Sequence, residues 1–217
     1  PGLTTSDGIG IDKDDNLYFL AGQNRMLDGK PYPIASASTL VKLRPEKAKA
    51  LCGGGPKIPV PAEKAALPAR PCDLAGGGGG TGTYWIEGAE WMYGGVGLHN
   101  MACICWNARP ALDLFARSFA PEINHFSVAV LDSNGNLILR VGQYGNIEDG
   151  QPLAAAGPST GSGQGGPPQP RSLGGDEVGL CFPAYLATHT DRRLFIADAG
   201  NSRIVSVKLG YNAEERI

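Results

Sequence analysis

The chain has 217 residues, which is long enough for one sizeable domain with a buried core, and a formal net charge of −2. This near-neutral balance, with no cluster of Lys or Arg, argues against a nucleic-acid partner. No apolar run approaches the roughly 18 residues that a membrane-spanning helix needs, so we expect no membrane span. The chain begins at Pro1, and we expect this start to be a processed or truncated end. The Gly-rich, Lys-poor composition favours a secreted or periplasmic location.

Glycine and proline are abundant, with 32 Gly and 17 Pro. Such a composition favours many turns and few long helices. Part of it lies in low-complexity stretches, such as the five glycines of residues 76–80. We therefore predict two flexible insertions, at about residues 45–83 and 149–176, because these stretches carry too little apolar surface to fold alone.

The beginning of the chain predicts a hairpin over residues 8–22, with a polar turn that starts at Asp12. The same pattern returns near the end, where residues 184–188 and 194–198 flank a turn that starts at His189. Both turn residues precede the next strand by five positions, so we interpret the two segments as copies of one hairpin.

Further strands complete each repeat. For the first repeat we expect a third strand at 39–43 and a fourth at 90–93. The third repeat continues with a strand at about 203–207 and a possible last strand at 213–217. These assignments give units of up to four strands, which is typical of propeller blades.

The middle repeat is expected over about residues 103–145. Its inner strands are placed at 103–106 and 111–116, and its outer strands at 126–131 and 137–142. The Asn134-Gly135 pair between the outer strands predicts a type I′ turn.

Two stretches resemble the NHL repeat: residues 194–209, LFIADAGNSRIVSVKL, and residues 128–146, VAVLDSNGNLILRVGQYGN. This resemblance implies an all-β fold, a β-propeller of four-stranded blades with about three blades present. It also implies that Asp198, Asn201 and Arg203 fix a turn between strands. Three blades would be half of a six-bladed ring, so the partners expected are a missing N-terminal propeller half or a second chain that completes the ring.

The cysteines suggest a second kind of site. Cys103 and Cys105 alternate on a predicted strand and face the same side, and Cys181 enters the third repeat at a corresponding place. With His99 they could converge on zinc or copper(I). Buried free thiols are the first alternative and a disulfide to Cys181 is the second. Cys52 and Cys72 bracket the first insertion and could close it.

Other polar groups fit ordinary roles better. Asp12, Asp14 and Asp15 could hold Ca²⁺, but the spacing of a calcium loop is absent, and a solvated turn is favoured. The charged residues around the middle repeat are expected to form a network between blades. These residues are Arg109, Asp113, Arg117 and Glu122.

Two functions follow from this organisation. The first is a binding or scaffold propeller whose rim loops recognise a protein or a carbohydrate partner. The alternative is a metal-dependent lyase or lactonase-like enzyme with its site at the propeller axis. The sequence identifies no catalytic residue, and the cofactor question stays open between zinc, copper and none.

Overall fold

The computed structural model describes residues 6–44, 46, 49–52, 68–76, 82–97, 108–146 and 178–210. In this part the regular structure is β-strand, apart from two short 3-10 turns, Ile123–His125 and Ala199–Asn201. No helix among the described residues is long and apolar enough to cross a membrane. The fold is therefore all-β, as expected.

Three antiparallel sheets each pair their strands in chain order. Sheet I has the strand order β1 (Ser6–Ile11), β2 (Leu17–Ala21), β5 (Ser38–Leu43) and β9 (Ala89–Val96). Sheet II has the order β10 (Ala111–Leu112), β11 (Ser118–Glu122), β12 (Ser127–Leu131) and β13 (Leu137–Val141). Sheet III has the order β16 (Pro183–His189), β17 (Arg193–Asp198) and β18 (Arg203–Lys208).

A fourth sheet, which we call the cap sheet, is built from the two long connections within sheet I. Its strands, in spatial order, are β4 (Lys30–Pro31), β3 (Asn24–Leu27), β7 (Leu74–Ala75), β8 (Thr83–Glu87) and β6 (Lys49–Cys52). In addition, β14 (Gln143–Tyr144) and β15 (Gly179–Leu180) form a short parallel pair between sheets II and III.

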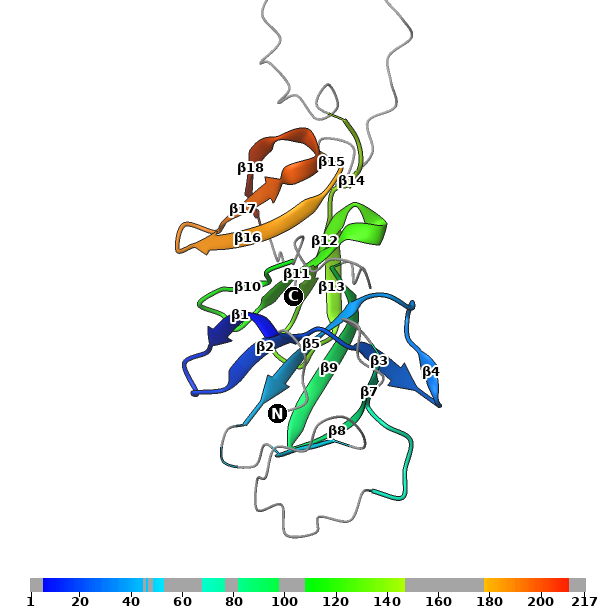
Figure 1. The fold of residues 1–217 in the computed structure, drawn as a ribbon. Coiled ribbons are helices and arrows are strands. Elements are labelled where there is room, and N and C mark those ends of the chain that lie inside the picture. Colours follow the sequence, from blue (N-terminus) through cyan, green and yellow to red (C-terminus); the bar gives the residue numbers. More distant parts are fainter. Residues whose placement is uncertain are drawn as a thin grey trace, which may run out of the picture.

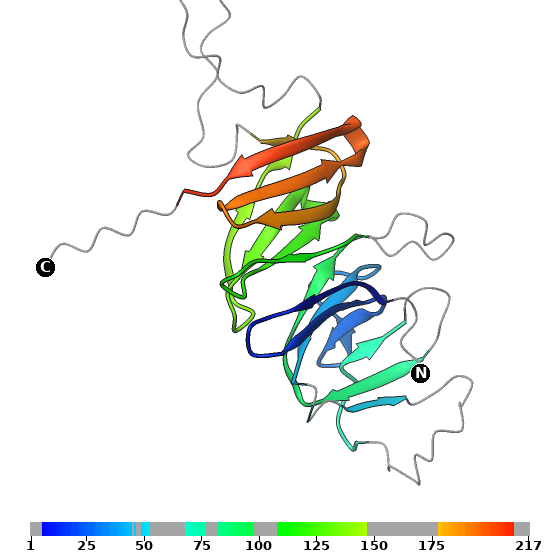
Figure 2. The ribbon, with the colours of Figure 1, turned by 90° about the vertical axis from the view of Figure 1, so that its left-hand side faces the viewer.

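The sheets follow one another along the molecule, with sheet III at the top of Figure 1, sheet II in the middle and sheet I below it. The view in Figure 2 shows the same succession, from the blue strands of sheet I to the orange strands of sheet III. The innermost strands β1, β10 and β16 are in contact with one another in this order.

Each space between sheets is filled by its own hydrophobic cluster. Leu20 and Leu40 of sheet I pack with Ala120 and Leu131 of sheet II. Between sheets II and III the cluster includes Phe119, Val130, Leu194 and Ile196. A third cluster, with Phe19, Val41 and Leu74, joins the other face of sheet I to the cap sheet. Sheet I is thus covered on both faces.

Glycine permits one of these contacts directly. A Cβ atom on Gly94 of β9 would lie 2.3 Å from the carbonyl oxygen of Tyr32 and 2.9 Å from Cβ of Arg25. No other residue allows so close an approach between β9 and the β3–β4 hairpin. Gly94 therefore fixes where the cap sheet meets sheet I.

Most strand predictions agree with the structure, and two details were wrong. Residues 111–116 are not one strand: β10 ends at Leu112, residues 113–117 form a turn, and the second strand is β11. The turn after Leu131 is not type I′, because its loop has three residues and only Gly135 has a positive φ, +82°. A three-residue loop that ends in such a glycine forms a bulged hairpin.

The first insertion also differs from the expectation of a flexible segment. Its described parts supply strands of the cap sheet, and Leu74 is completely buried. The physical reason is that Leu74 gives this Gly-rich stretch an apolar anchor in the cluster between the cap sheet and sheet I. Residues 103–106, 149–176 and 213–217 lie outside the described residues.

Candidate functional site

One turn geometry recurs where the first two strands of each sheet meet. In the first turn, Asp12 accepts hydrogen bonds from the backbone N–H groups of Asp14 (2.9 Å) and Asn16 (3.0 Å). Asp113 accepts the corresponding bonds from Phe115 (2.9 Å) and Arg117 (3.0 Å). These bonds satisfy backbone donors that the hairpin leaves unpaired, and they hold each turn in one shape.

Two other turns follow the same plan. Asp132 accepts hydrogen bonds from the backbone N–H groups of Asn134 (2.9 Å) and Asn136 (2.8 Å) in the turn between β12 and β13. In sheet III, Nδ1 of His189 accepts from the N–H of Asp191 (3.2 Å). The β1–β2, β10–β11 and β16–β17 turns all lie on the left of Figure 1, so they form one rim of the molecule.

The β10–β11 turn differs from the other two in what it exposes. Leu114 and Phe115 are 71% and 65% exposed. Below them, Nε of Arg117 donates to the Asp113 carboxylate at 2.7 Å, and the guanidinium lies 5.0 Å from the centre of the Phe115 ring. Two large apolar side chains are therefore presented to solvent on a turn that is already rigid.

A buried polar network lies beneath the neighbouring turn of sheet I. The Asp12 side chain is 2% exposed, and its carboxylate accepts hydrogen bonds from the Asn16 amide and from the Tyr18 hydroxyl at 2.9 Å. Burial opposes ionisation of Asp12, but these hydrogen bonds outweigh it and lower the carboxyl pKa. Burial and the bond to Asp12 both raise the pKa of Tyr18.

Lys42 connects this network to sheet II. Its ammonium group lies 3.0 Å from the Glu90 carboxylate and 3.9 Å from that of Asp12, and it donates to the Ser133 carbonyl at 3.1 Å. The Lys42 side chain is 8% exposed, so the charge is both buried and paired. Lys42 lowers the pKa of Glu90. The network thus fastens the β12–β13 turn of sheet II onto sheet I.

A second buried carboxylate lies at the far end of strand β11. Glu122 is 1% exposed, accepts a 2.7 Å hydrogen bond from the Tyr93 hydroxyl of sheet I, and forms a 2.6 Å ion pair with Nε of Arg140. Glu122 is thus linked to sheet I by the Tyr93 hydroxyl, while its ion pair with Arg140 stays within sheet II. Asp113 and Arg117, in contrast, pair within their own turn, and Arg109 stacks 5.4 Å from the ring centre of Tyr185 in sheet III.

Asp198 occupies the place in sheet III that Glu122 occupies in sheet II, directly before a 3-10 turn. It is completely buried, and its carboxylate accepts from the N–H groups of Cys181 (3.0 Å) and Phe182 (2.8 Å). The Asn201 amide donates to it at 2.7 Å, and Nε of Arg203 at 3.3 Å. Asp198, Asn201 and Arg203 thus form one hydrogen-bonded turn.

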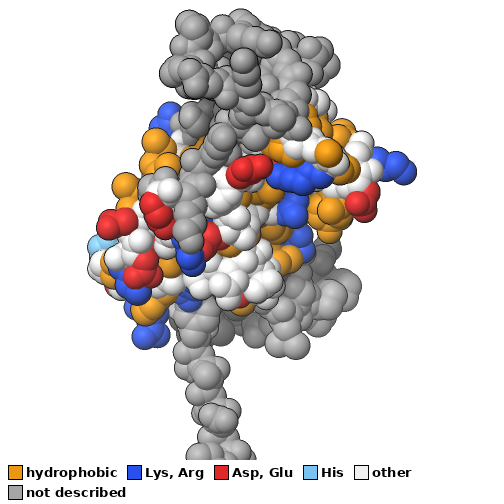
Figure 3. Space-filling view, turned by 90° about the horizontal axis from the view of Figure 1, so that it is seen from below, with side chains coloured by type: hydrophobic (Ala, Val, Ile, Leu, Met, Phe, Trp, Pro, Cys, Tyr) orange, Lys and Arg blue, Asp and Glu red, His pale blue; other side chains and the backbone are white. Residues whose placement is uncertain are grey.

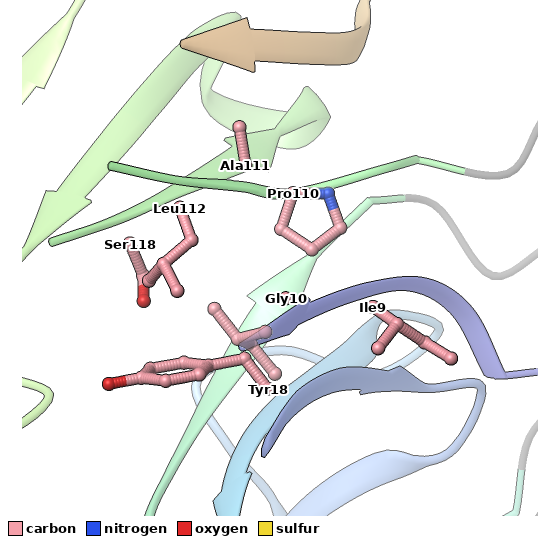
Figure 4. A pocket seen from close by; sticks show the side chains of 8 residues that line it. Ile9, Gly10, Tyr18, Pro110, Ala111, Leu112 and Ser118 are labelled. Carbon is pink, nitrogen blue, oxygen red and sulfur yellow. The ribbon is translucent and has the colours of Figure 1, made fainter. Parts of the chain in front are cut away.

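A small pocket of about 50 Å³ opens between the innermost strands of sheets I and II, as Figure 4 shows. Ile9, Gly10 and Tyr18 line it from sheet I, and Pro110, Leu112 and Ser118 line it from sheet II. Its volume is well below the hundreds of Å³ typical of organic ligand sites, so we do not assign a substrate to it.

Of the four predicted metal ligands, Cys181 alone lies among the residues that the structure describes. His99, Cys103 and Cys105 lie outside them, so their distance from Cys181 is not tested. Cys72 and Cys181 are partly buried free thiols, and neither forms the disulfide considered for it. Within the described ranges, no group of three or more His, Cys, Asp or Glu side chains is placed to hold a metal.

The exposed pair Leu114 and Phe115 is not evident from the sequence pattern, which predicts one strand over residues 111–116. The turn could have been found from spacing: Asp12, Asp113 and His189 precede the equivalent strand residues Leu17, Ser118 and Leu194 by five positions. When these three positions are aligned, residues 113–117 are predicted to form a turn with an apolar tip.

The face seen from below in Figure 3 carries acidic and basic side chains interspersed with scattered apolar ones, so no single charge dominates it. No known family model matches the chain. No curated protein matches it either.

Proposed function

We propose that this chain comprises three successive blades of an NHL-type β-propeller and acts as a binding module for a protein partner. Support for the propeller comes from sheets I and II, which are four-stranded antiparallel sheets in chain order. Sheet III repeats their first three strands, and the three sheets stack face to face. Single side chains repeat as well. Asp12 and Asp113 hold equivalent turns, and Glu122 and Asp198 are buried at equivalent places.

The observation that carries the binding function is the exposure of Leu114 and Phe115 on a rigid turn. Apolar residues at such a tip gain nothing for folding, and they are anchors of the kind that fill pockets on protein partners. Because the Asp113–Arg117 bonds preorganise the turn, little conformational entropy is lost when it binds.

The surroundings favour a protein over a carbohydrate. Lys13, Asp14 and Asp15 on one neighbouring turn, and Asp191 and Arg192 on the other, offer charges of both signs around an apolar centre. An apolar centre with a polar, charged rim is the usual anatomy of a protein interface.

The test is site-specific photocrosslinking from position 115 in extracts of the source cells. A photoreactive phenylalanine analogue at Phe115 should give a discrete protein adduct, and the same analogue at Leu27, which is 45% exposed on the cap sheet, should not. Excess unlabelled wild-type chain should compete the adduct away, while Leu114→Ser/Phe115→Ser should not. Binding of the wild type to a glycan array, together with the absence of a protein adduct, would replace the protein partner with a carbohydrate.

A further inference from the structure

The last sheet exposes a face that its two predecessors bury. We call the face that each sheet turns towards the next sheet along the chain its forward face. Aligning the sheets on their first turns makes Tyr18, Phe119 and Phe195 equivalent residues of the second strand. Tyr18 and Phe119 are 3% and 1% exposed, because the following sheet covers them. Phe195 is only partly buried and belongs to none of the hydrophobic clusters of the described chain.

The third strands show the same contrast. The strand pairing makes Leu40, Val128 and Ile204 equivalent, since they lie opposite Leu20, Pro121 and Ala197. Leu40 and Val128 are completely buried, whereas Ile204 is 75% exposed. The forward face of sheet III therefore exposes apolar side chains, Phe195 and Ile204, at positions where the two preceding sheets are covered, beside the hydrogen-bonded Arg193 and Ser206.

The opposite end of the stack has a smaller open surface. The cap sheet covers β2, β5 and β9 of sheet I but leaves the innermost strand β1 uncovered. Ile9 and Ile11 on β1 lie opposite Phe19 and Leu17 and are 73% and 64% exposed, and Ile9 also borders the pocket against sheet II.

The net charges beside these two open surfaces are opposite. Lys13, Asp14 and Asp15 are exposed in the turn that follows Ile11, which is acidic on balance. Arg192 and Lys208 are exposed with Asp191 at the corresponding end of sheet III, which is basic on balance. The two turns occupy the same rim, so a head-to-tail contact would place turns of opposite net charge side by side. A contact of sheet III with itself would bring together two ends of net positive charge.

We infer that the forward face of sheet III docks on β1 of a second copy of this chain. Phe195 of one copy packs against Ile9 and Ile11 of the other, as β11 already packs against β16 within the chain, and Ile204 lies at the margin of this contact. Two such contacts, related by a twofold axis, close the assembly as a dimer. The inference extends the repeated stacking of sheets and is independent of what Phe115 binds.

Sedimentation velocity of the full chain, over about 1 to 100 µM, tests this inference. The wild type should pass from monomer to dimer in this range. Phe195→Asp, and separately Ile9→Asp, should weaken the dimer at least about tenfold. Ile138→Asp, at a site 49% exposed on β13 of sheet II, is the matched control and should leave it unchanged. Far-UV circular dichroism confirms that each variant folds.

Charge exchange separates head-to-tail docking from any other dimer. Asp14→Arg/Asp15→Arg and Arg192→Asp/Lys208→Asp should each weaken the dimer about threefold to tenfold, and the combined variant should restore it. A wild type that stays monomeric, forms open polymers, or dimerises without responding to Asp14→Arg/Asp15→Arg overturns the inference. The crosslinking experiment at Phe115 can be repeated on monomeric Phe195→Asp, so failure of one proposal leaves the other testable.

Discussion

The outer faces at the two ends of this stack of sheets are covered to different extents. Sheet I carries long connections that fold into a cap sheet over its outer face, whereas the forward face of sheet III has no equivalent within the described chain. The cap sheet presents polar groups to solvent. Glu87 at the end of β8 is exposed, and Arg70 and Asp73, just before β7, form an ion pair. Stacked repeats need such a polar end layer for solubility. We therefore expect sheet III to depend more on its internal polar network.

The largest effect should come from removing the carboxylate that organises sheet III. Asp198→Ala leaves the N–H groups of Cys181 and Phe182 and the Arg203 guanidinium without their acceptor. We expect a loss of about 3 to 5 kcal/mol in the free energy of unfolding, measured by urea titration. Asp191→Ala, which removes an exposed carboxylate of the same sheet, is the control and should change stability little. A loss below about 1 kcal/mol for Asp198→Ala would show that the network is dispensable.

Equivalent truncations at the two ends should differ clearly. Leu74→Ala removes a completely buried side chain between the cap sheet and sheet I, and should cost about 2 to 4 kcal/mol. Ile204→Ala, on the open face, should cost less than about 0.5 kcal/mol when the protein is dilute. Thermal unfolding at low protein concentration measures both. Equal costs would mean that the open face is covered, or that the cap is not packed.

Stability should fall at both extremes of pH because of the network beneath the first turn. The folded pKa of Asp12 is lowered, so its contribution is present above its unfolded pKa, near 4, and is lost as the pH falls through the lower folded value. Tyr18 has a raised pKa, so its contribution is present below about pH 10 and is lost as the pH rises further. Chemical denaturation across the pH range should show this plateau. Asp12→Asn should lower the plateau and flatten the acid limb, and an unchanged acid limb would assign that limb to other carboxylates.

The smallest effect is a predicted gain. Ala116 closes the β10–β11 turn with φ of +58°, a left-handed conformation that costs energy for any residue with a Cβ atom. Ala116→Gly should therefore stabilise the chain by about 0.5 to 1 kcal/mol. The control is Ala187→Gly, in an extended strand, which should destabilise it. Destabilisation by Ala116→Gly would indicate that the Ala116 methyl group makes a stabilising contact.

Sequence reasoning succeeded where strands alternate regularly around a turn that can be recognised, as at Asp132 and at His189. It failed at residues 111–116, because Leu114, Phe115 and Ala116 continue an apolar run across a turn that contains no glycine. The cap sheet was also unexpected, because a low-complexity glycine run separates β7 from β8, and the short strands β6 and β7 show no periodicity of their own. A buried network such as Lys42 with Asp12 depends on contacts between residues that are distant in the sequence, and one strand's pattern cannot reveal it.

The contrast between the two ends is tested most directly by hydrogen exchange of the full chain at low and at high protein concentration, followed by mass spectrometry. Strand β5, covered on both faces, should exchange slowly at every concentration. Strand β18 should exchange faster than β5 in dilute solution and become more protected as the concentration rises, because docking covers Phe195 and Ile204. If β18 is as protected as β5 in dilute solution, and stays unchanged on concentration, sheet III has no open face and the account is contradicted.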